Sequence, residues 1–136
     1  MSWICPDCKR SFRHPNQSHS CKTFPIEKHF FNKHPGLRPA WDEIYKTVSA
    51  FGKIQVSSME NAIIVAAKSS FMAFKTRKEY AELEIVMDVE INEFPVYKTF
   101  RVSKSRVAHF IRIQSADEVD KQLKTWLKRA YEKVGS

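Results

Sequence analysis

Glycine is scarce in this sequence, with three residues among 136, and no two of them lie close together. A Gly-rich phosphate-binding loop is therefore excluded, because such a loop needs clustered glycines where its backbone approaches the phosphates. Aromatic residues are plentiful by contrast, at ten Phe, four Tyr and three Trp. This composition favours a packed globular domain over a low-complexity chain.

The sequence also lacks any apolar run near the ~20 residues that a membrane-spanning helix requires. It begins Met1-Ser2-Trp3, with no apolar leader of the secretory kind. It contains three cysteines, whereas a disulfide framework is typical of secreted chains with an even number. These features predict a soluble protein in a reducing, cytoplasmic setting, with no membrane partner.

The three cysteines are not scattered but lie near the amino terminus together with a histidine. Cys5 and Cys8 form a C-x-x-C pair, and His19 and Cys21 follow ten residues later. Thiolates and a neutral imidazole suit tetrahedral Zn²⁺, and a two-residue gap lets both sulfurs of a knuckle reach one ion. We therefore predict a zinc site made of Cys5, Cys8, His19 and Cys21. His14 is an alternative to His19, and His29 or His34 would serve only if the chain folded back.

We expect this zinc to be structural. Four protein ligands close the coordination shell, whereas a catalytic zinc keeps one position open for water. A thioredoxin-like redox role is disfavoured, because such a motif needs a strand before it and a helix after it within a βαβ unit, and only four residues precede Cys5. A module of residues 1–24 is too small to fold by apolar burial, so metal binding, worth about 10 to 16 kcal/mol in comparable peptides, would have to order it.

The net charge of +8 is spread along the chain, at +3 over residues 1–24 and +5 over the remainder. Basic side chains displace counterions from phosphates, so a basic surface is a candidate site for nucleic acid. The alternative is a merely solubilising surface. The candidate nucleic-acid-binding residues are Lys9, Arg10, Arg13, Lys22, Arg101, Lys104, Arg106 and Arg112.

After a docked linker over residues 25–36, residues 37–136 carry the pattern of one α+β domain. An amphipathic helix is predicted from Leu37 to Gly52, and a second begins at the capping box formed by Ser115 and Glu118. Between them the apolar period changes to two, which is typical of antiparallel strands. The predicted strands are Ile54–Ser57, Ala62–Ala67, Ser70–Lys75, Tyr80–Ile91, Tyr97–Ser103 and Val107–Ile113. The sequence thus predicts an antiparallel sheet of about five or six strands flanked by two amphipathic helices, with a small zinc knuckle before it.

An enzymatic site is hard to find in this pattern. Four carboxylates, on Glu82, Glu84, Asp88 and Glu90, share the polar side of the longest predicted strand and could hold a divalent metal. Ion pairing with a neighbouring basic strand is the favoured interpretation. No Glu-x-Lys motif of the restriction-nuclease kind occurs between residues 54 and 113, and His109 is interpreted as a packing or hydrogen-bonding residue. We predict a non-enzymatic protein.

Several motifs resemble those of a known bacterial family. They are the run Trp3 to Cys8, Phe12, the string from Asn16 to Cys21, Glu27, His29, Phe30, Trp41, Phe74, the run Ser115 to Glu118, Trp126, Leu127, Ala130 and Tyr131. Together they resemble the domain of unknown function family 5655, over nearly the whole chain. The resemblance implies a zinc-ribbon-like leader before an α+β domain, and favours His19 over His14 as the ligand. The family is uncharacterised, so no catalytic residue is implied.

Two functions are consistent with the sequence. The first is a binding protein that presents a basic surface to nucleic acid. The alternative is a carrier of a small ligand or metal, with a pocket between the sheet and the helices.

Overall fold

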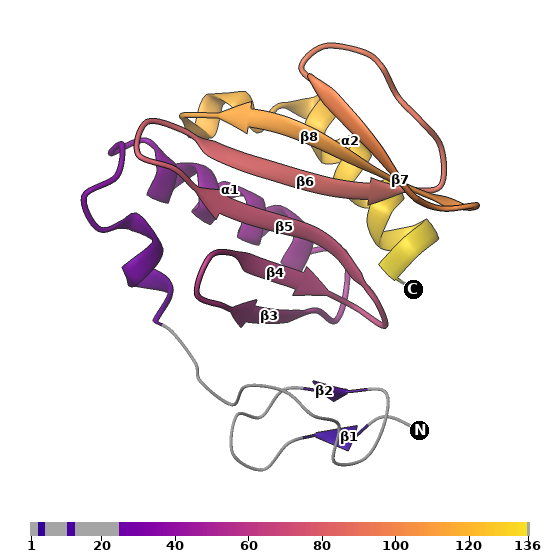
Figure 1. Ribbon diagram of the computed structural model, residues 1–136. Helices are drawn as coiled ribbons and strands as arrows, with labels where there is room; N and C mark the ends of the chain where they lie inside the picture. Colours follow the sequence, from indigo (N-terminus) through magenta and orange to yellow (C-terminus); the bar gives the residue numbers. More distant parts are fainter. Residues whose placement is uncertain (1–2, 5–10, 13–24, 136) are drawn as a thin grey trace.

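The structure is a computed structural model that describes residues 3–4, 11–12 and 25–135 (Figure 1). A two-stranded antiparallel sheet is formed by β1 (Trp3–Ile4) and β2 (Ser11–Phe12). The remaining elements build one α+β domain. They are η1 (Ile26–Phe30), α1 (Leu37–Ser49), β3 (Gln55–Ser58), β4 (Ile63–Ala66), β5 (Ser70–Thr76), β6 (Ala81–Met87), β7 (Lys98–Ser103), β8 (Arg106–Ile113), η2 (Ala116–Glu118), α2 (Lys121–Ala130) and the π-helical turn η3 (Tyr131–Gly135).

The large sheet has six antiparallel strands in the order β3-β4-β5-β6-β8-β7. The predicted α+β class and antiparallel sheet are therefore confirmed. The first four strands follow one another, but the last two change places, so that β8 pairs with β6 and β7 forms the edge. Because β6 and β7 are both antiparallel to β8, they run in the same direction, and the connection between them must return along the sheet from the end of β6 to the start of β7.

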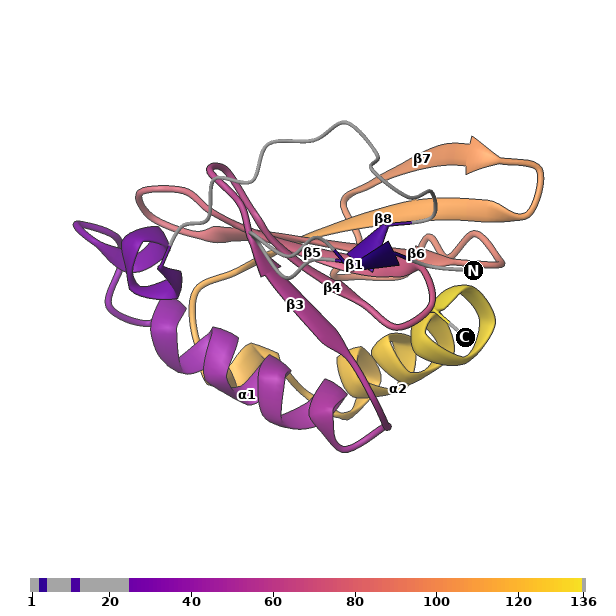
Figure 2. The same ribbon diagram turned by 90° about the horizontal axis from the view of Figure 1, so that it is seen from below.

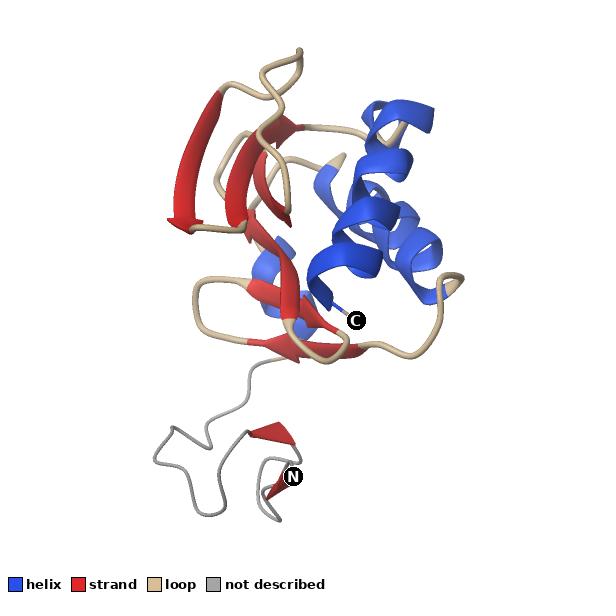
Figure 3. Ribbon diagram, turned by 90° about the vertical axis from the view of Figure 1, so that its right-hand side faces the viewer, coloured by secondary structure: helices blue, strands red, loops and turns tan. Residues whose placement is uncertain are grey.

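Both helices lie on one face of the sheet, and neither covers the opposite face (Figures 2 and 3). The period-two pattern of β6 explains this, because Ala81, Leu83, Ile85 and Met87 are fully buried while Glu82 and Glu84 are only partly buried on the opposite face. The helices supply the matching apolar stripes. From α1 the buried side chains are Leu37, Ala40, Trp41, Ile44 and Val48, and from α2 they are Leu123, Trp126, Leu127 and Ala130.

Strand β6 ends at Met87, four residues before the predicted end at Ile91. The reason lies in its partner, because Met87 pairs with Val107 and β8 begins one residue earlier at Arg106. Beyond that point no strand remains to accept the hydrogen bonds of the β6 backbone. The segment from Asp88 onward therefore leaves the sheet.

The second long helix also differs from the prediction, which placed its start at Ser115. The capping box of Ser115 and Glu118 is present, but it closes only the single turn η2. Val119 then leaves the helical conformation and enters the core, where it is 5% exposed. Helix α2 starts at Lys121, with the Asp120 carboxylate accepting the backbone N–H of Leu123 at 2.9 Å.

The predicted linker, residues 25–36, contacts the domain through η1 and the start of α1. The ring of Phe30 lies 6.2 Å from that of Phe74, and His29 is buried at 6% exposure. Gly36 allows α1 to begin close to the end of β8, because a Cβ at this position would lie 1.9 Å from the carbonyl oxygen of Gln114. A glycine is therefore needed here for close approach of two backbone segments.

Candidate nucleic-acid interface

The predicted zinc ligands Cys5, Cys8, His19 and Cys21 lie outside the described residues, as do four of the candidate phosphate contacts, Lys9, Arg10, Arg13 and Lys22. These predictions stay open. Within the described ranges, 3–4, 11–12 and 25–135, no group of three or more His, Cys, Asp or Glu could hold a metal ion.

One alternative zinc ligand is engaged elsewhere. His29 is buried in the α+β domain, and its Nε2 lies 2.9 Å from the hydroxyl of Ser58. Burial lowers the pKa of His29, against a hydrogen bond with the backbone of Met59 that raises it. Its ring is thus held by the domain's own hydrogen bonds.

The four remaining candidates belong to the β7–β8 hairpin. From Tyr97 to Ile113 the chain carries five basic side chains and no carboxylate, so the charge of this hairpin is entirely positive. The basic residues are Lys98, Arg101, Lys104, Arg106 and Arg112. Among the described residues, no carboxylate forms an ion pair with Lys98, Lys104 or Arg106.

Three of the predicted residues come together at the turn of this hairpin. The guanidinium of Arg101 donates to the carbonyl oxygens of Ser103, at 3.3 Å, and Lys104, at 3.0 Å. Arg106 begins β8 directly opposite Ser103, and the side chain of Lys104 is exposed between the strands. All three residues therefore lie at or next to this turn.

Arg112 lies apart from them, six residues further along β8 and so about 20 Å away. Its guanidinium carbon is 4.4 Å from the ring centroid of Tyr97 and 4.9 Å from that of Tyr80. A hydrogen bond with Tyr97 and the charge of nearby groups raise the pKa of Arg112. Glu82 faces it across the ladder and accepts the Tyr97 hydroxyl at 2.6 Å, so the charge of Arg112 is partly balanced.

Sequence reasoning missed two members of this surface, Lys98 and Phe100. Phe100 is 63% exposed, and it faces the open side of the sheet because it pairs with Ala108. Lys98 pairs with Phe110 in the next row, with its ammonium 4.6 Å from the centroid of the Phe110 ring. The alternate positions of Lys98 and Phe100, together with that of Val102, could have predicted that they share one side of a strand.

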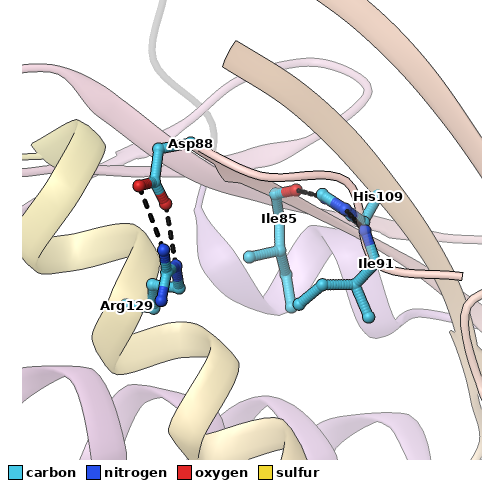
Figure 4. Close-up of polar contacts among 5 residues, drawn as sticks. All are labelled: Ile85, Asp88, Ile91, His109 and Arg129. Carbon is cyan, nitrogen blue, oxygen red and sulfur yellow. Dashed lines mark hydrogen bonds and ion pairs between the residues drawn. The ribbon is translucent and has the colours of Figure 1, made fainter. Parts of the chain in front are cut away.

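The predicted acidic row does not form a metal site. Glu84 lies 3.7 Å from Lys75 on β5, which supports the ion-pair interpretation, and Glu90 accepts a hydrogen bond from Asn92. Asp88 leaves the row altogether and forms a two-point contact with Arg129 of α2, at 2.8 and 3.1 Å (Figure 4). This hydrogen bond with Arg129 lowers the pKa of Asp88.

His109 is a hydrogen-bonding residue of the core, as predicted. It is fully buried, its Nε2 accepts the backbone N–H of Ile91 at 2.9 Å, and its Nδ1 lies 3.2 Å from the carbonyl oxygen of Ile85 (Figure 4). This arrangement requires the neutral ring with the proton on Nδ1. Burial lowers the pKa of His109 and so favours that neutral form.

Comparison with known proteins places the domain in a family. Searches of the curated proteins and of the solved structures found no match. In the described part of the chain, no helix is long and apolar enough to span a membrane. The family described as Domain of unknown function (DUF5655) matches residues 26–134. This range begins with η1 and ends one residue before the end of η3, so it spans the whole α+β domain. The match covers most of the sequence, and the chain therefore belongs to the DUF5655 family.

Proposed function

We propose that this protein is a non-enzymatic binding protein that contacts nucleic acid through a basic surface. The observation that carries the proposal is the β7–β8 hairpin, which carries Lys98, Arg101, Lys104 and Arg106 without a carboxylate among them and exposes Phe100 on the same strand as two of them. Phosphates attract such a surface because binding releases their condensed counterions.

The second part of the proposal is a structural zinc ion held by Cys5, Cys8, His19 and Cys21. The residue types and the spacing of Cys5 and Cys8 support it, because thiolates two residues apart, together with a neutral imidazole, suit a tetrahedral Zn²⁺ ion. The basic residues Lys9, Arg10, Arg13 and Lys22 of this module would then extend the phosphate-binding surface.

The test is the affinity of the full chain for labelled mixed-sequence DNA, measured by fluorescence anisotropy at several salt concentrations. We expect the logarithm of the affinity to fall linearly with the logarithm of the salt concentration, with a slope of about 0.9 for each phosphate contacted in duplex DNA. The double variant Lys104→Glu/Arg106→Glu should bind at least tenfold more weakly. It should also show a shallower salt dependence.

The matched control is Lys121→Glu/Lys128→Glu, which makes the same change of net charge at exposed positions of α2 on the helical side of the sheet. Its affinity should stay close to that of the wild type. Equal weakening by both double variants would show a general charge effect and exclude the hairpin as the site. A lack of binding even at low salt would exclude the nucleic-acid function.

A second candidate function is a small-ligand carrier. A cavity of about 350 Å³ lies beside the start of β7, lined by Phe94, Tyr97, Arg112 and Gln122 among others. The space between the sheet and the helices is occupied by buried side chains such as that of Trp41, so this alternative rests on the surface cavity. A ligand specific to the folded state raises the thermal midpoint, and a thermal-shift screen of metabolites and metal ions therefore tests it.

A further inference from the structure

Exposed apolar side chains are unevenly distributed over the described domain. Most of the larger ones belong to the segment that crosses from β6 into β7. They are Val89, Phe94, Tyr97, Phe100 and Val102, with Phe94 90% and Phe100 63% exposed. Val89 and Phe94 lie in the connection before β7, whereas Phe100 and Val102 lie on the basic hairpin itself and Tyr97 directly precedes it. A single exposed apolar side chain is ordinary, but several of them on a basic hairpin indicate a binding surface.

The described helices cover one face of the sheet (Figure 2), and Phe100 projects from the other face. Its neighbour on β8 is Ala108, and the next residue in the same row is Val86 of β6. Ala108 is 1% exposed and Val86 is partly buried, so the Phe100 ring supplies most of the accessible apolar surface of this row.

Cations lie on both sides of Phe100 along the strand direction. Lys98, one row away, extends over the ring of Phe110, and on the other side Arg106 starts β8. A planar group stacked on the Phe100 ring would therefore have a positive charge on either side. A nucleobase with its two neighbouring phosphates has this distribution of apolar surface and negative charge.

We infer that the open face of β7 and β8 binds single-stranded nucleic acid, with an unpaired base stacked on Phe100. The inference rests on the proposed nucleic-acid function and narrows its substrate class. Duplex DNA hides the faces of its bases within its own stack, whereas a single strand offers them to aromatic side chains. A flat sheet face with exposed rings and flanking cations is suited to the single strand.

Self-association through the edge of β7 is the main competing use of the same surface. Edge strands can pair with a second copy, but basic side chains on the edge oppose such pairing. Two copies would bring Lys98, Arg101 and Lys104 of one chain against those of the other. Charge complementarity therefore favours a polyanion as the occupant.

The experiment compares a labelled 12-nucleotide oligothymidine with a 12-base-pair duplex, titrated with the full chain at one salt concentration. We expect the wild type to bind the single strand more tightly. Phe100→Ala and Phe100→Leu should each weaken single-strand binding about 5- to 150-fold, the range for one stacked base. Phe100→Trp keeps a stacking ring and should retain the affinity, and none of the three should change duplex binding.

The thermal midpoint of each variant checks folding, and only small changes are expected at so exposed a position. Equal affinity for single strand and duplex, or wild-type single-strand affinity in Phe100→Leu, would overturn this inference and leave the proposed function standing. Absence of binding to either probe would overturn both. A concentration-dependent dimer that Phe100→Ala abolishes, without nucleic-acid binding, would identify self-association as the use of this surface.

Discussion

The hydrogen bonds of His109 make a sharp prediction about how stability depends on pH. Its neutral ring accepts the N–H of Ile91 through Nε2 and contacts the carbonyl of Ile85 through Nδ1, inside a fully buried site. Protonation would put a hydrogen on Nε2 and remove the only acceptor it offers to Ile91. Since Ile91 lies in the connection between β6 and β7, this bond holds the segment that lets β7 reach the edge of the sheet.

Burial lowers the pKa of both His109 and His29 below the ordinary value of 6.5. As the pH falls below that value, the unfolded chain takes up protons that the folded chain still excludes. The free energy of unfolding therefore decreases from about pH 7 downward, until the pH reaches the lowered pKa values of the folded state. Above pH 7 the two histidines do not make the free energy of unfolding depend on pH.

Replacing His109 by leucine removes the acceptor and leaves a partly buried N–H of Ile91 unpaired. The expected loss is about 1 to 3 kcal/mol at neutral pH, the cost of one unsatisfied group. His109→Leu should also show a weaker pH dependence than the wild type, with the remainder caused by His29. Urea unfolding followed by circular dichroism at pH 7.5 and pH 5.5 measures both effects.

His29→Gln is the control, because it removes the second titrating ring without touching the connection between β6 and β7. In the double variant the acid-induced loss should nearly vanish over this pH range. A wild-type stability that stays level or rises between pH 7.5 and 5.5 would contradict the assignment of two neutral, buried histidines.

Three further predictions concern other parts of the molecule. Gly36→Ala should cost about 1 to 3 kcal/mol in urea unfolding, because the added Cβ would lie 1.9 Å from the carbonyl oxygen of Gln114; unchanged stability would contradict this contact. In Arg129→Ala, the pKa of Asp88 should rise toward its ordinary value because the hydrogen bond to the guanidinium is lost, as an NMR titration can measure; a pKa that stays low would exclude Arg129 as its cause. Elemental analysis of gently purified protein should find one zinc per chain, and Cys8→Ser should lose it while the circular dichroism of the α+β domain is kept; wild-type protein without zinc would refute the metal site.

The strands and helices were largely readable from the sequence because most of them have one buried and one exposed side. The alternation of apolar and acidic residues along β6 predicts a half-buried strand, and Leu83 and Glu84 lie on opposite faces as expected. The end of β6 was not readable, because the apolar pattern continues through Val89 and Ile91. It is set by where β8 begins, which is information from a distant part of the chain.

The start of α2 shows a second limit of local patterns. Ser115 and Glu118 satisfy the capping-box pattern and do form it, yet Asp120 caps the longer helix five residues later. Both caps form as their local patterns predict. The long helix starts only after the second cap because Val119, which lies between them, is buried in the core, and the position of the core cannot be predicted from these residues alone.

Part of the candidate interface can be predicted from the sequence, because basic residues can be counted along it. Arg101, Lys104 and Arg106 are predicted in this way, and the structure places them at or next to one turn. Phe100 was not found, because an exposed phenylalanine and a buried one look alike in sequence. Its environment follows from the strand order, which no local pattern specifies.

The strand order β6-β8-β7, in which β7 is the edge strand, bears directly on the function of β7. Strand β8 fills the inner place and supplies buried side chains such as Ile111 and Ile113, whereas five of the six residues of β7 are exposed. An edge strand with so little burial contributes little to the core, so packing does not explain an aromatic residue at Phe100. Natural edge strands avoid exposed apolar residues and carry charges to prevent aggregation. Here the charges are present and the aromatic is present as well, which is the combination expected of a surface that binds a polyanion by both its phosphates and its bases.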